Sequence, residues 1–221
     1  SDLGTASVFA CILAGLLWVS GLRLGIFGIA LSVGLVGLTA AILTSPYRVQ
    51  RFMVFLNPFA EDQYKLYGWQ PAHSLLGLAS GGLFGVGLGA SRQKWGNLAE
   101  AHTDFIFAVI GEELGLFGTL ATLLLLSILI FSIFKLALRA GDPMVRYVAS
   151  GFGVWIAIQT ILNIGSAISV LPVVGVTLPL VSYGGSALIA TYMGIGFVLG
   201  AARRDPVIYK ELKETGIKWL R

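Results

Sequence analysis

Charged side chains are scarce in this sequence and absent from long stretches of it. Only 12% of the 221 residues are Asp, Glu, Lys or Arg, whereas 56% are hydrophobic and the mean hydropathy is +0.85. No soluble core needs so much apolar surface, so the composition indicates a membrane protein rather than a soluble globular domain. The single cysteine, Cys11, excludes an intrachain disulfide.

The charge-free runs predict where the chain crosses the membrane, because a helix needs about 20 apolar residues to span the hydrocarbon. We predict an all-α, polytopic bundle that forms one integral-membrane domain over residues 1–221. The predicted spans are 3–22, 24–44, 105–134, 148–170 and 184–202. Residues 45–103 form a predicted extracytoplasmic loop, and residues 203–221 form a cytoplasmic tail that includes an interfacial helix.

Part of the long loop is apolar but rich in glycine. Residues 74–90 contain six glycines. Such a density argues against a straight spanning helix and for a broken or re-entrant segment, which is tolerated where it is buried in protein or lines a wet cavity.

The basic residues predict the orientation of the bundle. Ten of the 15 fall on one side, in the first turn, the loop at 135–146 and the tail, and five fall in the long loop. Because cytoplasmic segments carry the excess of Lys and Arg, the first set is predicted to be cytoplasmic and the long loop to face outward. The net charge of +4 is therefore read as membrane topology and not as a surface for nucleic acid.

Residues 100–118 (EAHTDFIFAVIGEELGLFG) carry four carboxylates, and three of them, Asp104, Glu112 and Glu113, lie at or inside the edge of an apolar run. Ionisable groups in lipid are costly and are functional candidates. Two interpretations of Asp104 remain open on chemistry alone: it, or the preceding threonine, caps a helix, or it is a catalytic or binding carboxylate. The glutamates are predicted to bond neighbouring helices.

Helical geometry separates these three carboxylates. Glu112 lies about 12 Å deeper than Asp104 and about 80° around the helix, and Glu113 about 180° around it. They cannot share one face, so Asp104 is expected to act with loop residues. In a later charge-free span, Gln159 and Asn163 are expected to make interhelical hydrogen bonds.

Three phrases in order, GLGASRQKW (87–95), EAHTDFIFAVIGEELG (100–115) and LPLVSYGGSAL (178–188), resemble signatures of the SEDS family (shape, elongation, division and sporulation). These are polytopic bacterial enzymes that polymerise peptidoglycan glycan strands from lipid II. The resemblance runs from Asp2 to about Arg204 and is stronger to the division members. It implies a ten-span fold of which this chain, beginning abruptly at SDLGT, would be a fragment with the last five spans.

The resemblance also implies that Asp104 is the essential catalytic residue and that a divalent cation, Mg²⁺ or Mn²⁺, assists. An outer carboxylate can act as a general base, and a diphosphate leaving group needs cations. Headgroup anchoring is the alternative for each loop cation, and a simple turn is the alternative for SYGGS. The predicted substrate-binding residues are Lys94, Arg92, His102, Arg48, Ser182 and Tyr183, with Arg51 ranked lower, and Glu112 and Glu113 are predicted to be structural.

The predicted function is a septal peptidoglycan glycosyltransferase in the bacterial inner membrane, with lipid II as substrate. A class B penicillin-binding protein and other division proteins are its implied partners. Three alternatives remain: an elongation-type polymerase, a lipid II flippase or transporter, and a non-catalytic scaffold. A translocating carboxylate should lie near the bilayer midplane, whereas Asp104 is predicted to lie at the outer edge.

Overall fold

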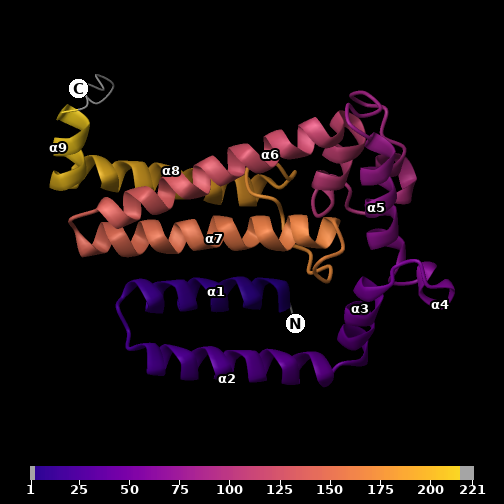
Figure 1. Ribbon diagram of the computed structural model, residues 1–221, viewed down its shortest axis with the longest axis horizontal. Helices are drawn as coiled ribbons and strands as arrows, with labels where there is room; N and C mark the ends of the chain where they lie inside the picture. Colours follow the sequence, from indigo (N-terminus) through magenta and orange to yellow (C-terminus); the bar gives the residue numbers. More distant parts are fainter. Residues whose placement is uncertain (1–2, 215–221) are drawn as a thin grey trace.

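The computed structural model describes residues 3–214, and within these it is helical without strands (Figure 1). The long helices lie side by side, with their axes roughly along one direction. They are α1 (Leu3–Val19), α2 (Leu24–Leu43), α6 (Ile106–Arg139), α7 (Pro143–Ala167) and α8 (Gly185–Arg204). The shorter helices α3 (Pro46–Leu56) and α9 (Pro206–Glu214) cross that direction at opposite ends of the molecule.

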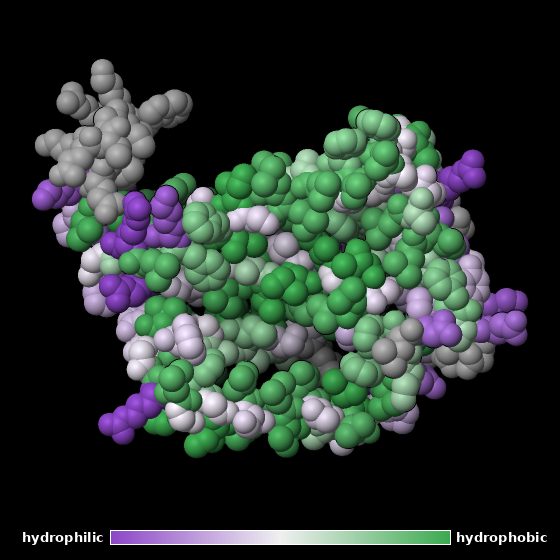
Figure 2. Space-filling model, viewed as in Figure 1, coloured by the Kyte–Doolittle hydropathy of each residue, from purple (hydrophilic) through white to green (hydrophobic). Residues whose placement is uncertain are grey.

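Within the described residues, α2, α6, α7 and α8 are long and apolar enough to cross a membrane, and α1 is a shorter apolar helix. Apolar side chains cover the face shown in Figure 2, and hydrophilic residues gather toward its two ends. No side chain of α2 is buried, and Ile29, Val33 and Val36 are each at least 67% exposed. An apolar helix that is exposed all round is suited to lipid and not to water.

The observed helix ends differ from the expected spans by up to five residues. Helix α6 continues to Arg139 instead of ending near residue 134, because cationic side chains are favourable near a helix C-terminus. Helix α7 begins at Pro143 instead of residue 148, because the Asp142 carboxylate accepts a hydrogen bond from Met144 N at 2.8 Å and caps the helix. The charged residues located the polar loop correctly, but the predicted spans stopped short of them, whereas the observed helices include Lys135, Arg139 and Arg146.

The stretch 45–103 is more structured than the word loop implies. Besides α3 it contains α4 (Glu61–Tyr64), α5 (Trp69–Gly81) and a π-helical turn at Gln93–Asn97. The glycine-rich segment is broken, as its composition predicts: α5 ends at Gly81, and the glycines of 82–89 take positive φ values. A Cβ on Gly81 would lie 1.8 Å from Gly111 O, so α5 and α6 touch backbone to backbone.

Helix α6 is interrupted at Gly115, where φ is +67° and ψ is −159°. The glycine-rich loop supplies hydrogen-bond partners for the backbone groups left unpaired at the interruption. The amides of 116–117 donate to the carbonyls of 82–83, and the amides of 86–87 donate to the carbonyls of 112–113, with N···O distances of 2.9 to 3.3 Å. Backbone groups freed in an apolar environment need such partners, so the loop and the helix form one unit.

The core lies between α6, α7 and α8. Its main cluster contains Ile133, Ala137, Ala149, Phe152, Ile156 and Val198. Helix α1 packs on α7 through glycines: a Cβ on Gly15 would lie 2.6 Å from a methyl of Val154. At the end of the bundle that carries α3 and α5, one smaller cluster joins the start of α6 to the loop before it, and another joins α6 to the end of α7 and the loop that follows. These clusters position the candidate site.

Candidate active site at the start of helix α6

Asp104 lies just before α6, and its side chain does not cap the helix. The N-cap residue is Phe105, which makes no side-chain capping bond. The Thr103 hydroxyl bonds Glu100 instead, donating to its carbonyl at 3.2 Å and to its carboxylate at 2.9 Å. The capping interpretation of Thr103 or Asp104 is therefore wrong, and Asp104 keeps its carboxylate for another task.

The backbone that carries Asp104 is held from outside. The carbonyls of residues 102–104 each accept a hydrogen bond from a later part of the chain. The donors, in order, are Tyr183 N at 2.9 Å, Ser182 Oγ at 2.5 Å and Asn163 Nδ2 at 2.8 Å. Three successive carbonyls pinned in this way fix the place and direction of the Asp104 side chain.

The surroundings raise the pKa of the Asp104 carboxyl. Burial raises the pKa of the half-buried carboxyl, the negative charge of Glu100 raises it further, and Arg51 on α3 lowers it. A Cβ placed on Gly175 would lie 3.4 Å from Asp104 Oδ2, and Gly175 has a φ of +73°. A glycine at that place leaves open space beside the carboxylate.

Arg51 is the basic residue whose positive charge lowers the pKa of Asp104. Its guanidinium Nη1 donates to Val173 O at 3.4 Å, so α3 reaches the segment before Gly175. Arg51 also lines a cavity of about 90 Å³, together with Tyr67, Gln70 and Leu171. The sequence ranked Arg51 below Lys94 and Arg92, which are closer to Asp104 along the chain, but of these three it is the charge of Arg51 that lowers the pKa of Asp104.

The other predicted cations point elsewhere. Lys94 Nζ pairs with Glu113 Oε1 at 2.7 Å, and Arg48 Nη1 donates to Ala41 O at the end of α2 at 2.7 Å. The Arg92 side chain is exposed, while its backbone N–H binds Glu112. Their predicted contact with substrate stays a prediction, without support from proximity to Asp104.

The SYGGS residues divide into two roles. Ser182 is 3% exposed, and its hydroxyl accepts from Leu178 N at 2.7 Å while donating to Thr103 O. Its single donor is used inside the protein, so the contacts of Ser182 in the structure shape the site, and its predicted contact with substrate stays a prediction. Tyr183 is 75% exposed, and its ring lies edge-on to exposed His102 at 5.6 Å. This aromatic pair is available to a ligand next to Asp104.

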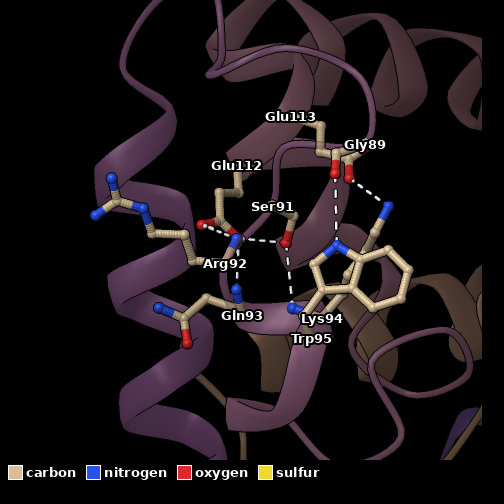
Figure 3. A network of polar contacts seen from close by, with 8 residues as sticks. All are labelled: Gly89, Ser91, Arg92, Gln93, Lys94, Trp95, Glu112 and Glu113. Carbon is tan, nitrogen blue, oxygen red and sulfur yellow. Dashed lines mark hydrogen bonds and ion pairs between the residues drawn. The ribbon is translucent and has the colours of Figure 1, made fainter.

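Glu112 and Glu113 bind the preceding loop and not the neighbouring helices, which corrects the expectation that they bond the helices of the bundle (Figure 3). Glu112 is 1% exposed and accepts the Ser91 hydroxyl and the amides of Arg92 and Gln93. Their loop partners are 19 to 21 residues away. No local pattern in the sequence indicates such pairs.

Two further contributors were missed or misread. Glu100 was not in the predicted site, although its negative charge raises the pKa of Asp104. Asn163, expected to bond helices, donates to the carbonyls of Asp104 and Val176 and so ties two loops to α7. A buried amide in a charge-free span was the available signal, but it could not name the partners.

The described residues hold no group of three or more His, Cys, Asp or Glu side chains suited to a metal. Asp104 and Glu100 offer two carboxylates within electrostatic reach of each other. Mg²⁺ commonly uses one or two carboxylates and completes its shell with water and substrate phosphates, so this pair is the candidate donor set for the predicted cation.

A carboxylate with a raised pKa, firmly placed and adjoining open space, can take a proton from a substrate hydroxyl. An arginine beside it can offset anionic charge. Together, fold and site define a polytopic helical membrane protein with a candidate general base at one end of its bundle.

The chain belongs to the FtsW/RodA/SpoVE family of cell cycle proteins, whose sequence model matches residues 1–206. It is 44% identical over 201 residues to the probable peptidoglycan glycosyltransferase FtsW of Tolumonas auensis, covering 90% of this chain and 52% of that protein. It is 42% identical over 202 residues to stage V sporulation protein E of Bacillus subtilis, covering 91% and 55%. The chain thus spans about half the length of these relatives.

Two solved structures share the fold. A chain of a peptidoglycan synthase complex that coordinates polymerisation and crosslinking matches with a TM-score of 0.72 at 31% identity, covering 93% of this chain and 57% of that one. The rod shape-determining protein RodA of Thermus thermophilus, solved as an Asp-to-Ala variant, matches with a TM-score of 0.60 at 32% identity, covering 93% and 51%. The expected family and polytopic helical fold are confirmed.

Proposed function

We propose that this chain carries the catalytic base of a peptidoglycan glycosyltransferase that polymerises lipid II during cell division. The observation that carries the proposal is Asp104: a half-buried carboxyl with a raised pKa, on backbone fixed by three hydrogen bonds. Relatives named FtsW and probable peptidoglycan glycosyltransferase, at 37% to 44% identity, support the reaction and the septal role.

In the proposed reaction Asp104 accepts the proton of the 4-hydroxyl of the acceptor sugar. The freed oxygen forms a bond to the anomeric carbon of the donor, and the bond from that carbon to the lipid diphosphate breaks. The departing diphosphate carries the negative charge away. Arg51, whose charge lowers the pKa of Asp104, is the residue we assign to offset the charge of the diphosphate.

A divalent cation would add to this offset by neutralising diphosphate oxygens. Asp104 and Glu100 are the residues that would hold it, each through carboxylate oxygen.

The proposed orientation places Asp104 outside the cell. The turn after α1, the loop between α6 and α7, and α9 all lie at one end of the bundle, and Asp104 lies toward the other (Figure 1). Basic residues concentrate at the first end, among them Arg23, Arg139, Arg146 and Arg203. By the positive-inside rule that end is cytoplasmic, and the described tail ends there.

The proposed partner is a class B penicillin-binding protein that crosslinks the new strands, within the division machinery at the septum. The structural relative from a peptidoglycan synthase complex supports this pairing. An elongation role, a lipid transporter and a scaffold without catalysis are the competing outcomes of the test below.

The test is glycan polymerisation from labelled lipid II by the full-length protein with its transpeptidase partner. Asp104→Asn keeps the size of the side chain and removes the base, so we expect product formation to fall by about 10²- to 10⁴-fold. Binding of the partner should not change. Product near the wild-type rate would overturn the proposal; a scaffold predicts that result, and a transporter predicts loss of lipid II translocation instead.

A further inference from the structure

Glu112 is a buried carboxylate that the proposed reaction does not use. It is 1% exposed, and so is Ser91, whose hydroxyl donates to Glu112 Oε2 at 2.5 Å. Arg92 N donates to Oε1 at 2.9 Å, and Gln93 N donates to Oε2 at 3.3 Å (Figure 3). Both oxygens of this side chain thus accept hydrogen bonds from residues 91–93.

These bonds close a loop that contains Asp104. Ser91 and Glu112 are 21 residues apart along the chain, and Asp104 lies between them. Inside the loop a small core packs residues before α6 against its first turns. The core contains Leu98, Ala101, Phe105, Ala108 and Val109. If residues 91–93 moved, the packed side chains of this core would therefore transmit the movement to the backbone of Asp104.

Glu112 itself is held in place by other contacts. Its carbonyl accepts from Val86 N at 2.9 Å, beside the interruption of α6 at Gly115. The preceding Gly111 lies against Gly81, since a Cβ on Gly81 would lie 1.8 Å from the carbonyl oxygen of Gly111. The carboxylate thus projects from a rigid part of the fold, and rigid support is what a positioning residue needs.

We propose that Glu112 is a positioning residue for Asp104: by holding residues 91–93 against α6 it closes the loop that sets the catalytic carboxylate. This inference rests on the proposed function. Glu112 touches neither substrate nor Asp104, and it acts through the loop. The hydrogen bonds at the other end of the loop, to the carbonyls of residues 102–104, complete the support.

A glutamine cannot replace Glu112 in this arrangement. Its amide nitrogen would face the Arg92 N–H in one orientation and the Gln93 N–H in the other, so one donor would meet another. The loop would lose its anchor with almost no change in side-chain volume. Ser91→Ala removes only one of the three bonds and should act in the same direction with a smaller effect.

The experiment uses the full-length protein with its transpeptidase partner and two measurements: kcat and KM for polymerisation of labelled lipid II, and hydrogen–deuterium exchange of residues 91–98. For Glu112→Gln we expect kcat to fall by about 10²-fold, the cost of a displacement of roughly 1 Å at the reacting groups, with KM little changed. Exchange at Arg92 and Gln93 should become faster. Glu61→Gln, which alters an exposed carboxylate on α4, is the matched control and should change neither.

Asp104→Asn in parallel separates the two proposals. If Asp104→Asn is inactive and Glu112→Gln keeps the wild-type kcat, the positioning role is overturned while the proposed function stands. If Asp104→Asn is active, the proposed function falls and the positioning role falls with it. Unchanged exchange in Glu112→Gln would also overturn the inference. Should that variant not fold, Ser91→Ala decides: a lower kcat with faster exchange supports the inference, and an unchanged kcat overturns it.

Discussion

Two aspartates lie just outside helices at opposite ends of the bundle, and their carboxyl groups have opposite surroundings. Asp205 follows α8, is 1% exposed, and receives backbone N–H groups on both oxygens. The donors are Asp142 N at 2.8 Å, Val207 N at 3.0 Å and Ile208 N at 3.1 Å. Asp104 precedes α6, and there the hydrogen bond from Asn163 Nδ2 is to its backbone carbonyl and not to its carboxyl group.

The pKa of each group follows from this difference. Burial raises the pKa of Asp205, but the backbone hydrogen bonds outweigh burial and hold it below its usual range. At Asp104 burial and Glu100 together outweigh Arg51, and the pKa rises. Burial alone does not decide whether an aspartate is a cap or a base; the donors around its oxygens do.

Asp205→Asn should separate stability from activity. The amide replaces one accepting oxygen with a donor, and we expect the protein to lose about 1–2 kcal/mol of unfolding free energy at neutral pH. Because the folded pKa is depressed, the stabilisation is present above the unfolded pKa of about 3.9 and disappears as pH falls through the folded value. Thermal unfolding in detergent at several pH values measures this effect.

Polymerisation by Asp205→Asn should stay near the wild-type rate below its unfolding temperature. A Tm equal to that of the wild type at neutral pH would contradict the capping role. A loss of activity in the folded variant would contradict the division of tasks between the two aspartates.

The smaller test concerns the acid limb of the pH–rate profile. Asp104 acts as a base only when deprotonated, so activity falls as pH drops through its raised pKa. Glu100→Gln removes a charge that raises this pKa and should move the limb to lower pH. Arg51→Gln removes a charge that lowers it and should move the limb to higher pH. Steady-state rates in a buffer series measure both, and shifts in the same direction would contradict the electrostatic account.

The sequence predicts the helices well because lipid imposes one rule everywhere: a span must be apolar and about 20 residues long. Charge-free runs therefore located α1, α2, α6, α7 and α8. The interruption of α6 at Gly115 escaped prediction, since its cause is a loop from residues 82–87 that supplies the missing backbone partners. The broken character of residues 74–90 was predictable from glycine content, but its place against α6 was not.

The site divides in the same way. The motif around Asp104 could be found in the sequence, because an ionisable group at the edge of an apolar run is conspicuous. The partner of Lys94 and the ranking of Arg51 could not, because both depend on which distant elements meet in space. Ser182 shows the limit most clearly: a hydroxyl in a turn is compatible with a ligand contact and with a fixed hydrogen bond, and no sequence pattern indicates its bond to the Thr103 carbonyl.

Chemical rescue tests the central claim, that Asp104 is the base, most directly. Asp104→Gly removes the carboxylate and leaves space for a small acid, and lipid II polymerisation is measured with and without added formate. The account predicts a rate about 10²-fold or more below wild type without formate and partial recovery as formate is added. Polymerisation by Asp104→Gly at the wild-type rate without formate would contradict it.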